Sequence, residues 1–163
     1  MATWADLAGA EPEMAKRGRE HIYQYGVGLG FLATIGADGM PRVHPVCPIV
    51  TDGGLWVFVI PSPKRGDLLR DGRYALHAFT PADIDDEFMV IGHAPPAMDA
   101  TARAAAVAAY HQPVADDHDL FELDIERTLL ATYAHRGAWP PTYRRWHAPD
   151  APARPSERTE DPA

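Results

Sequence analysis

The sequence predicts a mainly β protein, α+β if its elements are counted, in which short antiparallel strands form a closed or split barrel with a few short helices. Many short segments are rich in β-branched and aromatic residues, and turns containing Gly and Asp separate them. One short helical segment is inserted between the third and fourth predicted strands. Long helices do not alternate with strands, as they would in a parallel α/β sheet.

The first part of the chain is predicted to begin with a helix and to continue as three strands. Residues 11–25 carry Met14, Ile22 and Tyr25 at near-helical spacing, and Gly26 follows as a helix stop. The predicted strands are 31–35, 42–50 and 55–60, joined by the turns 36–39 and 51–54. Because short turns join them, these strands predict an antiparallel meander.

Ser62 and Pro63 predict the start of a short helix that runs to Arg70, because a serine side chain can cap free amides and proline is tolerated in the first turn. Further along, the predicted elements are strands at 73–79, 87–93, 121–125, 128–133 and 142–146 and an alanine-rich helix at 98–110. The polar, Pro-rich sequence after His147 predicts one folded domain over residues 1–147 and a disordered tail over 148–163.

The length and composition fit one domain without a membrane segment. The chain has 163 residues, 46% of them hydrophobic. Its longest apolar stretches, such as 55–61, are too short to cross a bilayer, and residues 1–20 lack the apolar block of a secretion signal. A single cysteine, Cys47, excludes an internal disulfide and favours a cytoplasmic location, where it is expected to be a small buried hydrophobic residue.

The charge is distributed unevenly along the chain. Residues 1–80 hold 8 acidic and 8 basic residues, whereas residues 81–163 hold 15 acidic and 7 basic ones, so the whole net charge of −8 lies in the second half. Such an acidic field repels the phosphate backbone of a nucleic acid, which is therefore not expected as a partner. Against this background Arg42 and Lys64, both next to predicted strands, stand out as candidate anion ligands.

Residues 30–93 carry an ordered series of short motifs: Leu32-Ala33-Thr34, Asp38-Gly39, Pro41, Val43, Pro45, Ser62-Pro63-Lys64, Leu69 and Asp71-Gly72-Arg73. In this order they resemble the core of the pyridoxamine phosphate oxidase-like family, whose members are FMN-binding split β-barrels. Between residue 93 and Trp146 the resemblance is weaker. The complete ordered set is more specific than any one of its motifs.

The resemblance implies a cofactor, FMN or a related deazaflavin, in a cleft between the two subunits of a homodimer. Ser62 and Lys64 take the places of the family's phosphate-binding turn, and Arg42 takes that of its strand arginine. The backbone of Val57, Phe58, Val59 and Ile60 is expected to pass along the flavin ring. Trp146 is expected either to stack against the flavin or to close the barrel.

General chemistry supports the phosphate site independently of the resemblance. A helix N-terminus presents free amides and a positive partial charge, and a nearby Lys or Arg adds charge-assisted hydrogen bonds. The alternative is that Ser62 is an ordinary helix cap and Lys64 a solvated surface residue. Two departures from the family lower the expected charge and contacts there: Pro63 stands where a second basic residue is common, and Gly66-Asp67 replaces a pair that ends in Asn.

The histidines have a structural and a functional interpretation. His44 alternates with Arg42 on one strand face, so it could line the cleft as a substrate contact or a proton donor, although a structural role is the simpler interpretation. His77 and His93 are interpreted as structural residues of strands. His111, Asp116, Asp117 and His118 match no metal-ligand spacing, and no metal site is predicted.

Taken with the resemblance, these residues predict a flavin-dependent oxidoreductase that acts on an unidentified small molecule, with the protein supplying orientation and electrostatics for the cofactor. Two alternatives remain open. One is a deazaflavin-dependent reductase with the same fold, and the other is a non-catalytic protein that binds flavin or haem.

Overall fold

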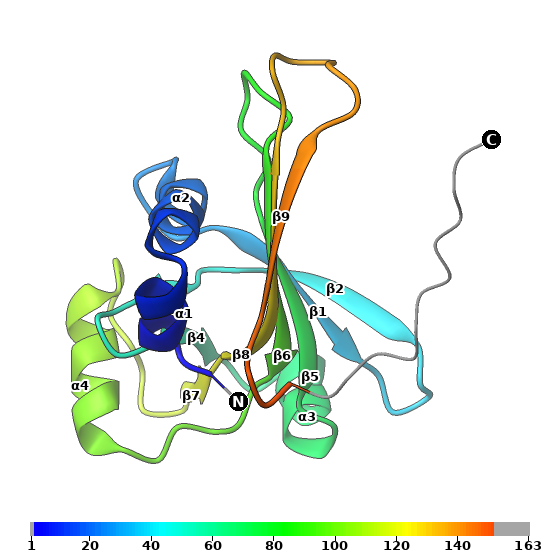
Figure 1. Ribbon diagram of the computed structural model, residues 1–163. Coiled ribbons are helices and arrows are strands. Elements are labelled where there is room, and N and C mark those ends of the chain that lie inside the picture. Colours follow the sequence, from blue (N-terminus) through cyan, green and yellow to red (C-terminus); the bar gives the residue numbers. More distant parts are fainter. Residues whose placement is uncertain (1, 152–163) are drawn as a thin grey trace.

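Two antiparallel sheets make up the body of the protein in the computed structural model, which describes residues 2–151 (Figure 1). The six-stranded sheet has the order β2-β1-β5-β6-β8-β9 and the three-stranded sheet the order β3-β4-β7. The strands are β1 (Gly30–Ile35), β2 (Pro41–Val46), β3 (Ile49–Val50), β4 (Leu55–Val59), β5 (Arg73–Ala78), β6 (Glu87–His93), β7 (Asp119–Glu122), β8 (Asp124–Thr132) and β9 (Thr142–His147). The mainly β prediction is confirmed, and the two sheets do not close into one barrel.

Four helices accompany the sheets: α1 (Trp4–Ala10), α2 (Pro12–Tyr23), α3 (Pro63–Arg70) and α4 (Ala100–Ala109). The helix α1 was not predicted, although Thr3 and Asp6 form a capping box, in which each side chain accepts a hydrogen bond from the other residue's backbone N–H. The predicted helix at 11–25 is confirmed as α2, which begins at Pro12 and ends two residues early, at Tyr23.

The segments of the predicted meander pair antiparallel in succession, but they are divided between the two sheets. The segment predicted as one strand, 42–50, breaks at Cys47 and Pro48, where the chain leaves the six-stranded sheet and enters the other. A proline cannot donate a ladder hydrogen bond, so the strand is interrupted there. A second change of sheet at Leu123 divides the predicted strand 121–125 between β7 and β8, and 128–133 continues β8 instead of forming a separate strand.

The main core lies on the inner face of the six-stranded sheet, under α1 and α2. Alternate residues of the strands, among them Leu32, Leu76 and Val90, are buried there. Phe88 packs edge-on against Trp4 of α1, with ring centroids 6.0 Å apart. A smaller cluster under α4 contains Phe58 and other residues of the three-stranded sheet.

The packed part of the chain extends past β9. Ala148 is buried, and its N–H donates to the carbonyl of Glu126 at 2.9 Å. Of the tail predicted over 148–163, residues 152–163 lie outside the described part of the chain. Among residues 2–151, none of the helices is both long and apolar enough to traverse a lipid bilayer.

Candidate functional site

The helix α3 lies against the inner face of β1, and its N-terminal end carries two residues of the predicted site, Ser62 and Lys64. Its contact with the sheet is polar: Thr34 of β1 donates from its hydroxyl to the carboxylate of Asp67 on α3, at 3.0 Å. In the β1–β2 register Arg42 stands opposite Thr34, and His44 opposite Leu32. Thr34 and Leu32 both point inward, so Arg42 and His44 share the face that meets α3, as their spacing predicted.

Ser62 occupies the N-cap position of α3, but the predicted side-chain cap is wrong. Its hydroxyl donates instead to the carbonyl of Ile60, at 2.9 Å. The first helical hydrogen bond joins the N–H of Gly66 to the carbonyl of Ser62. The amides of Lys64 and Arg65 in the first turn therefore have no partner within the helix, and no serine oxygen covers them.

Lys64 is a half-buried cation that makes no ion pair with any residue of the described chain. Burial lowers the pKa of its ammonium group below the usual value, while the nearby thiol of Cys47 acts in the opposite direction. A charged group in this position is costly unless a counter-charge joins it. Such a group is therefore suited to receive an anion.

His44, given a structural role as the simpler interpretation of the sequence, lies within the same cluster. Its Nε2 is buried and has no hydrogen-bond partner among the described residues. Burial is the main cause that lowers the pKa of His44, and the positive charges of Lys64 and Arg42 lower it further against the opposing effect of Asp67. A buried nitrogen without a partner in the protein leaves a hydrogen-bonding position for a ligand or a water molecule.

Arg42 is less available to bind a phosphate than the resemblance implied. Its guanidinium lies 3.8 Å from the carboxylate of Asp67, which is only 3% exposed. That carboxylate is also bound by Arg70 at 3.2 Å. Asp67 stands where the family often has Asn, so in this chain the strand arginine is partly neutralised from within the protein.

For the strand β4, the predicted contact with the flavin ring involves the backbone and not the side chains. Val57, Phe58 and Val59 have buried side chains, whereas Ile60 is 51% exposed. On one edge these residues pair with β7, but on the other edge β3 pairs only with Leu55 and Trp56. From Val57 onward that second edge has no strand partner in the part of the chain that the structure describes, but Val57 and Val59 are fully buried, so only the end of the segment, at Ile60, is open to a ligand.

Trp146 is not near these residues within one chain. It lies on β9, at the edge of the six-stranded sheet opposite to β2, and packs partly buried against the main core. It lines a separate hollow with Ala2, Asp6 and Ala10. A flavin contact from Trp146 thus requires a second subunit.

Two residues near Lys64 differ from what the sequence predicted: Cys47 was expected to be buried, and Tyr110 was not identified. Cys47 is partly exposed rather than fully buried, because it stands at the break between β2 and β3. Tyr110 follows α4, and its ring packs against Phe58 with centroids 5.4 Å apart. Burial and the adjacent Cys47 thiol raise the pKa of the Tyr110 hydroxyl. No local motif marks Tyr110, since only the folded chain brings it beside Cys47.

No metal centre accompanies this cluster. Among residues 2–151 the structure brings together no group of three or more His, Cys, Asp or Glu side chains that could hold a metal ion. His118 lies 3.8 Å from Asp117, but these two residues belong to a surface turn.

Solved structures share this architecture at low sequence identity. A heme binding protein from Mycobacterium smegmatis matches with a TM-score of 0.62 and 19% identity, over 80% of this chain and 57% of that one. A pyridoxamine 5'-phosphate oxidase-related, FMN binding protein from Nostoc punctiforme matches with a TM-score of 0.60 and 15% identity, over 88% of this chain and 91% of that one. A NimC/NimA family protein from Clostridium acetobutylicum matches with a TM-score of 0.59 and 14% identity, over 80% and 92%.

The chain spans only 57% of the length of the mycobacterial protein. No protein-family model matches the sequence, and no curated protein matches it in sequence. The motifs of residues 30–93 and the solved structures agree on the architecture. The chain has the split-barrel fold of the pyridoxamine phosphate oxidase-like family.

Proposed function

We propose that this protein binds FMN at the N-terminus of α3 and acts as a flavin-dependent oxidoreductase on a small molecule. The observation that carries the proposal is the half-buried Lys64, which has no ion pair among the described residues and is close enough to His44 for its charge to add to the lowering of the His44 pKa by burial. A phosphate there would supply the missing counter-charge and accept from the free amides of the first turn.

The residues present fit the parts of FMN. Lys64 and the first amides of α3 would hold the phosphate, with Arg42 contributing less because Asp67 already shares it. The end of β4, where Ile60 is exposed, would lie along the ring, and His44 would be positioned to hold or release a proton at Nε2. When bound, the flavin supplies hydride or electron transfer, while these residues bind it, orient it and limit the access of water.

We also propose that the protein is a homodimer with the cofactor between its subunits. The outer face of the six-stranded sheet, opposite α1 and α2, carries a row of aligned, partly or fully exposed residues across five strands: Pro45, Phe31, His77, Met89 and Leu129. Val43 beside this row is 64% exposed. A mostly apolar sheet face of this extent is expected to be covered by another subunit. A partner subunit would also bring a second Trp146 into reach of the flavin.

The absorption spectrum and mass of the ligand carried by the purified protein test the cofactor directly. A flavin spectrum supports the proposal, a deazaflavin spectrum would replace FMN by its analogue at the same site, and a Soret band would favour haem binding, as in the mycobacterial protein of the same fold.

The phosphate site is tested by titrating FMN and riboflavin into Lys64→Ala, with Lys16→Ala as the matched control. These are the two lysines of the chain, and Lys16 is exposed on α2. A charge-assisted hydrogen bond contributes about 1.5–3 kcal/mol, so FMN binding to Lys64→Ala should weaken by about ten- to a hundredfold. Riboflavin, which lacks the phosphate, should bind all three proteins alike. FMN affinity within about twofold of wild type in Lys64→Ala would refute the phosphate site.

A further inference from the structure

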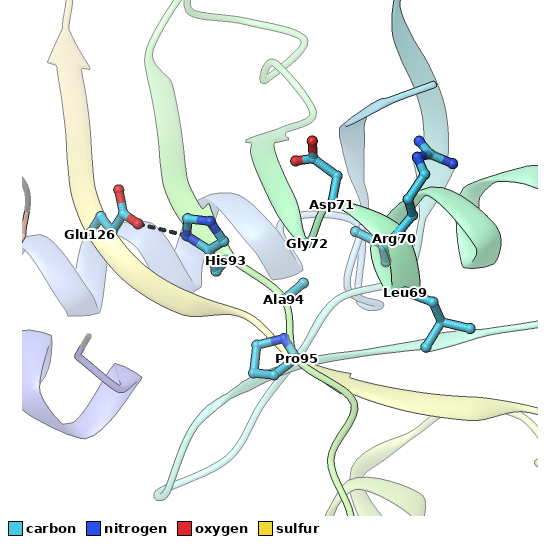
Figure 2. Close-up of a pocket in the computed structure, with 9 residues that line it drawn as sticks. Leu69, Arg70, Asp71, Gly72, His93, Ala94, Pro95 and Glu126 are labelled. Atoms are coloured by element: carbon cyan, nitrogen blue, oxygen red, sulfur yellow. Dashed lines mark hydrogen bonds and ion pairs between the residues drawn. The ribbon is translucent and has the colours of Figure 1, made fainter. Parts of the chain in front are cut away.

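A hollow of about 470 Å³ opens at the other end of α3, away from the proposed phosphate site. The last turn of α3 and Gly72 form one wall, and His93, Ala94 and Pro95 form the other with Glu126 (Figure 2). This volume lies in the range of sites that bind small organic molecules. None of the residues assigned to the flavin lines it.

A β-bulge places Glu126 at this hollow. In the β6–β8 register Ile91 pairs with Arg127 and Gly92 with Ile125, so Glu126 is the extra residue of β8 and pairs with neither. A bulge turns a side chain out of the regular alternation, and bulges are frequent beside functional sites. Here the bulge brings the buried Glu126 carboxylate to the last residue of β6, His93.

His93 and Glu126 form a hydrogen-bonded pair that leaves the second nitrogen of the His93 ring without a partner. The distance from Nδ1 of His93 to Oε1 of Glu126 is 2.7 Å, and the His93 side chain is 40% exposed. A carboxylate can only accept, so Nδ1 carries the hydrogen and Nε2 of the neutral ring is an acceptor. Figure 2 shows the ring between Glu126 and the wall that carries Asp71 and Gly72, so Nε2 is the polar atom available to a ligand.

The other charged groups around the hollow are already paired. Arg70 binds Asp67 at 3.2 Å and also donates to the carbonyl of Ile35. Asp71 is bound by Arg73 at 2.6 Å, and this hydrogen bond lowers the pKa of Asp71 to about 2. Among the described side chains that line the hollow, these pairs leave two acceptors with unmet hydrogen-bonding capacity, Nε2 of His93 and the second carboxylate oxygen of Glu126.

The remaining wall is apolar and the local charge is negative. Leu68, Leu69, Ala94 and Pro95 supply the apolar surface. The carboxylate of Glu126 lies at the hollow, and Asp124 is nearby, where burial raises the pKa of its carboxyl group and His93 acts in the opposite direction. This field disfavours an anion, while an apolar body with a single hydrogen-bond donor meets both the wall and Nε2.

We propose that this hollow is a second ligand site, which binds a neutral phenol. Its ring packs against the leucines of α3 and Pro95, and its hydroxyl donates to Nε2 of His93. Glu126 fixes the tautomer that makes Nε2 an acceptor. The site lies at the opposite end of α3 from Lys64, so the inference does not rest on the proposed flavin site.

The test compares 4-ethylphenol with 4-ethylanisole, in which a methyl group replaces the hydroxyl hydrogen and so removes the donor, by isothermal titration of the full-length wild-type protein. The phenol should bind about tenfold more tightly, which is the effect of one hydrogen bond of about 1.4 kcal/mol. In nitrogen-detected NMR the Nε2 resonance of His93 should shift with the phenol and not with the ether. Equal affinities, an unmoved resonance, or no phenol binding at about 10 mM would overturn the proposal.

Variants and competition locate the binding. His93→Phe keeps an apolar ring and should lose the preference for the phenol, whereas His135→Phe, at an exposed histidine of another loop, should keep it. Saturating FMN should leave phenol binding unchanged. If FMN displaces the phenol, the phenol occupies the flavin site and the proposal is wrong. If FMN does not bind at all, the flavin proposal fails while the comparison of phenol and ether still decides this one.

Discussion

The carboxylate of Asp67 lies 3.8 Å from the guanidinium of Arg42, inside the helix–sheet contact that forms one wall of the proposed phosphate site. Asp67→Asn keeps the shape and the acceptor for the Thr34 hydroxyl but removes a negative charge and frees Arg42. We expect FMN to bind Asp67→Asn about fivefold more tightly, or ~1 kcal/mol, through weaker repulsion of the phosphate. Isothermal titration measures this, with riboflavin as the uncharged control. Unchanged or weaker FMN binding would show that Asp67 does not act on the phosphate.

The exposed outer face of the six-stranded sheet predicts the effect of a charge on assembly. Val43→Lys places an ammonium group in the proposed subunit interface, so the variant should sediment as a monomer at concentrations where the wild type is a dimer. Met98→Lys is the matched control, because Met98 is 90% exposed and lies before α4, away from this face. A wild type that sediments as a monomer, or a Val43→Lys protein that remains dimeric, would exclude this face as the interface.

His21 of α2 predicts a loss of stability in mild acid. Its Nε2 is buried without a partner in the described chain, and burial lowers the pKa of His21, with Arg17 acting in the same direction against Asp86 and Glu20. As the pH falls through 6.5, the unfolded chain takes up the proton first, so the free energy of unfolding should fall until the folded pKa is passed. One such group changes the free energy of unfolding by at most about 1.4 kcal/mol per pH unit.

Denaturant unfolding at several values between about pH 7.5 and pH 5.5 measures this dependence. His21→Leu should reduce the slope of stability against pH. A residual slope is expected, because the pKa of His44 is lowered as well. An equal slope in His21→Leu and wild type would assign the acid sensitivity to other groups.

The sequence predicted most elements but not their arrangement. Local patterns place β1, β6 and α3 within one or two residues, since alternation, turn glycines and Pro63 are encoded locally. The assignment of strands to sheets depends on the breaks at Pro48 and Leu123, where the chain crosses between sheets. Nothing near these residues specifies a partner, because β4 pairs with β7, far along the chain.

The residue types of the candidate site were predictable from the sequence, but the ion pairs and hydrogen bonds of these residues were not. The motif and the rarity of lysine pointed to Lys64, but the lack of an ion pair there, and of a partner for His44, depends on burial by the folded chain. The ion pair that partly neutralises Arg42 arises because α3 packs against β1, the strand that pairs with β2. His93 and Glu126 are 33 residues apart and meet only through the bulge in β8, which no periodic pattern indicates.

Gly18 in α2 faces the ring of Phe88, and this contact predicts opposite effects for two similar substitutions. A Cβ atom at Gly18 would lie 2.3 Å from the nearest atom of the Phe88 ring, which is fully buried in the core. Gly9 of α1 has nothing within 4 Å of the same position. Alanine favours a helix over glycine by about 1 kcal/mol, so Gly9→Ala should stabilise the protein by about 0.5–1 kcal/mol.

Gly18→Ala has the same gain in helix propensity but forces the Phe88 ring to move in a packed core, at a cost of about 1–3 kcal/mol. We therefore expect it to be destabilised relative to wild type, and more clearly so relative to Gly9→Ala. Urea unfolding of the three proteins at one pH gives the comparison, since a change in midpoint without a change in slope reports stability alone. If Gly18→Ala is as stable as Gly9→Ala, α2 can move away from β6, and the close contact between Gly18 and Phe88 is not required for the fold.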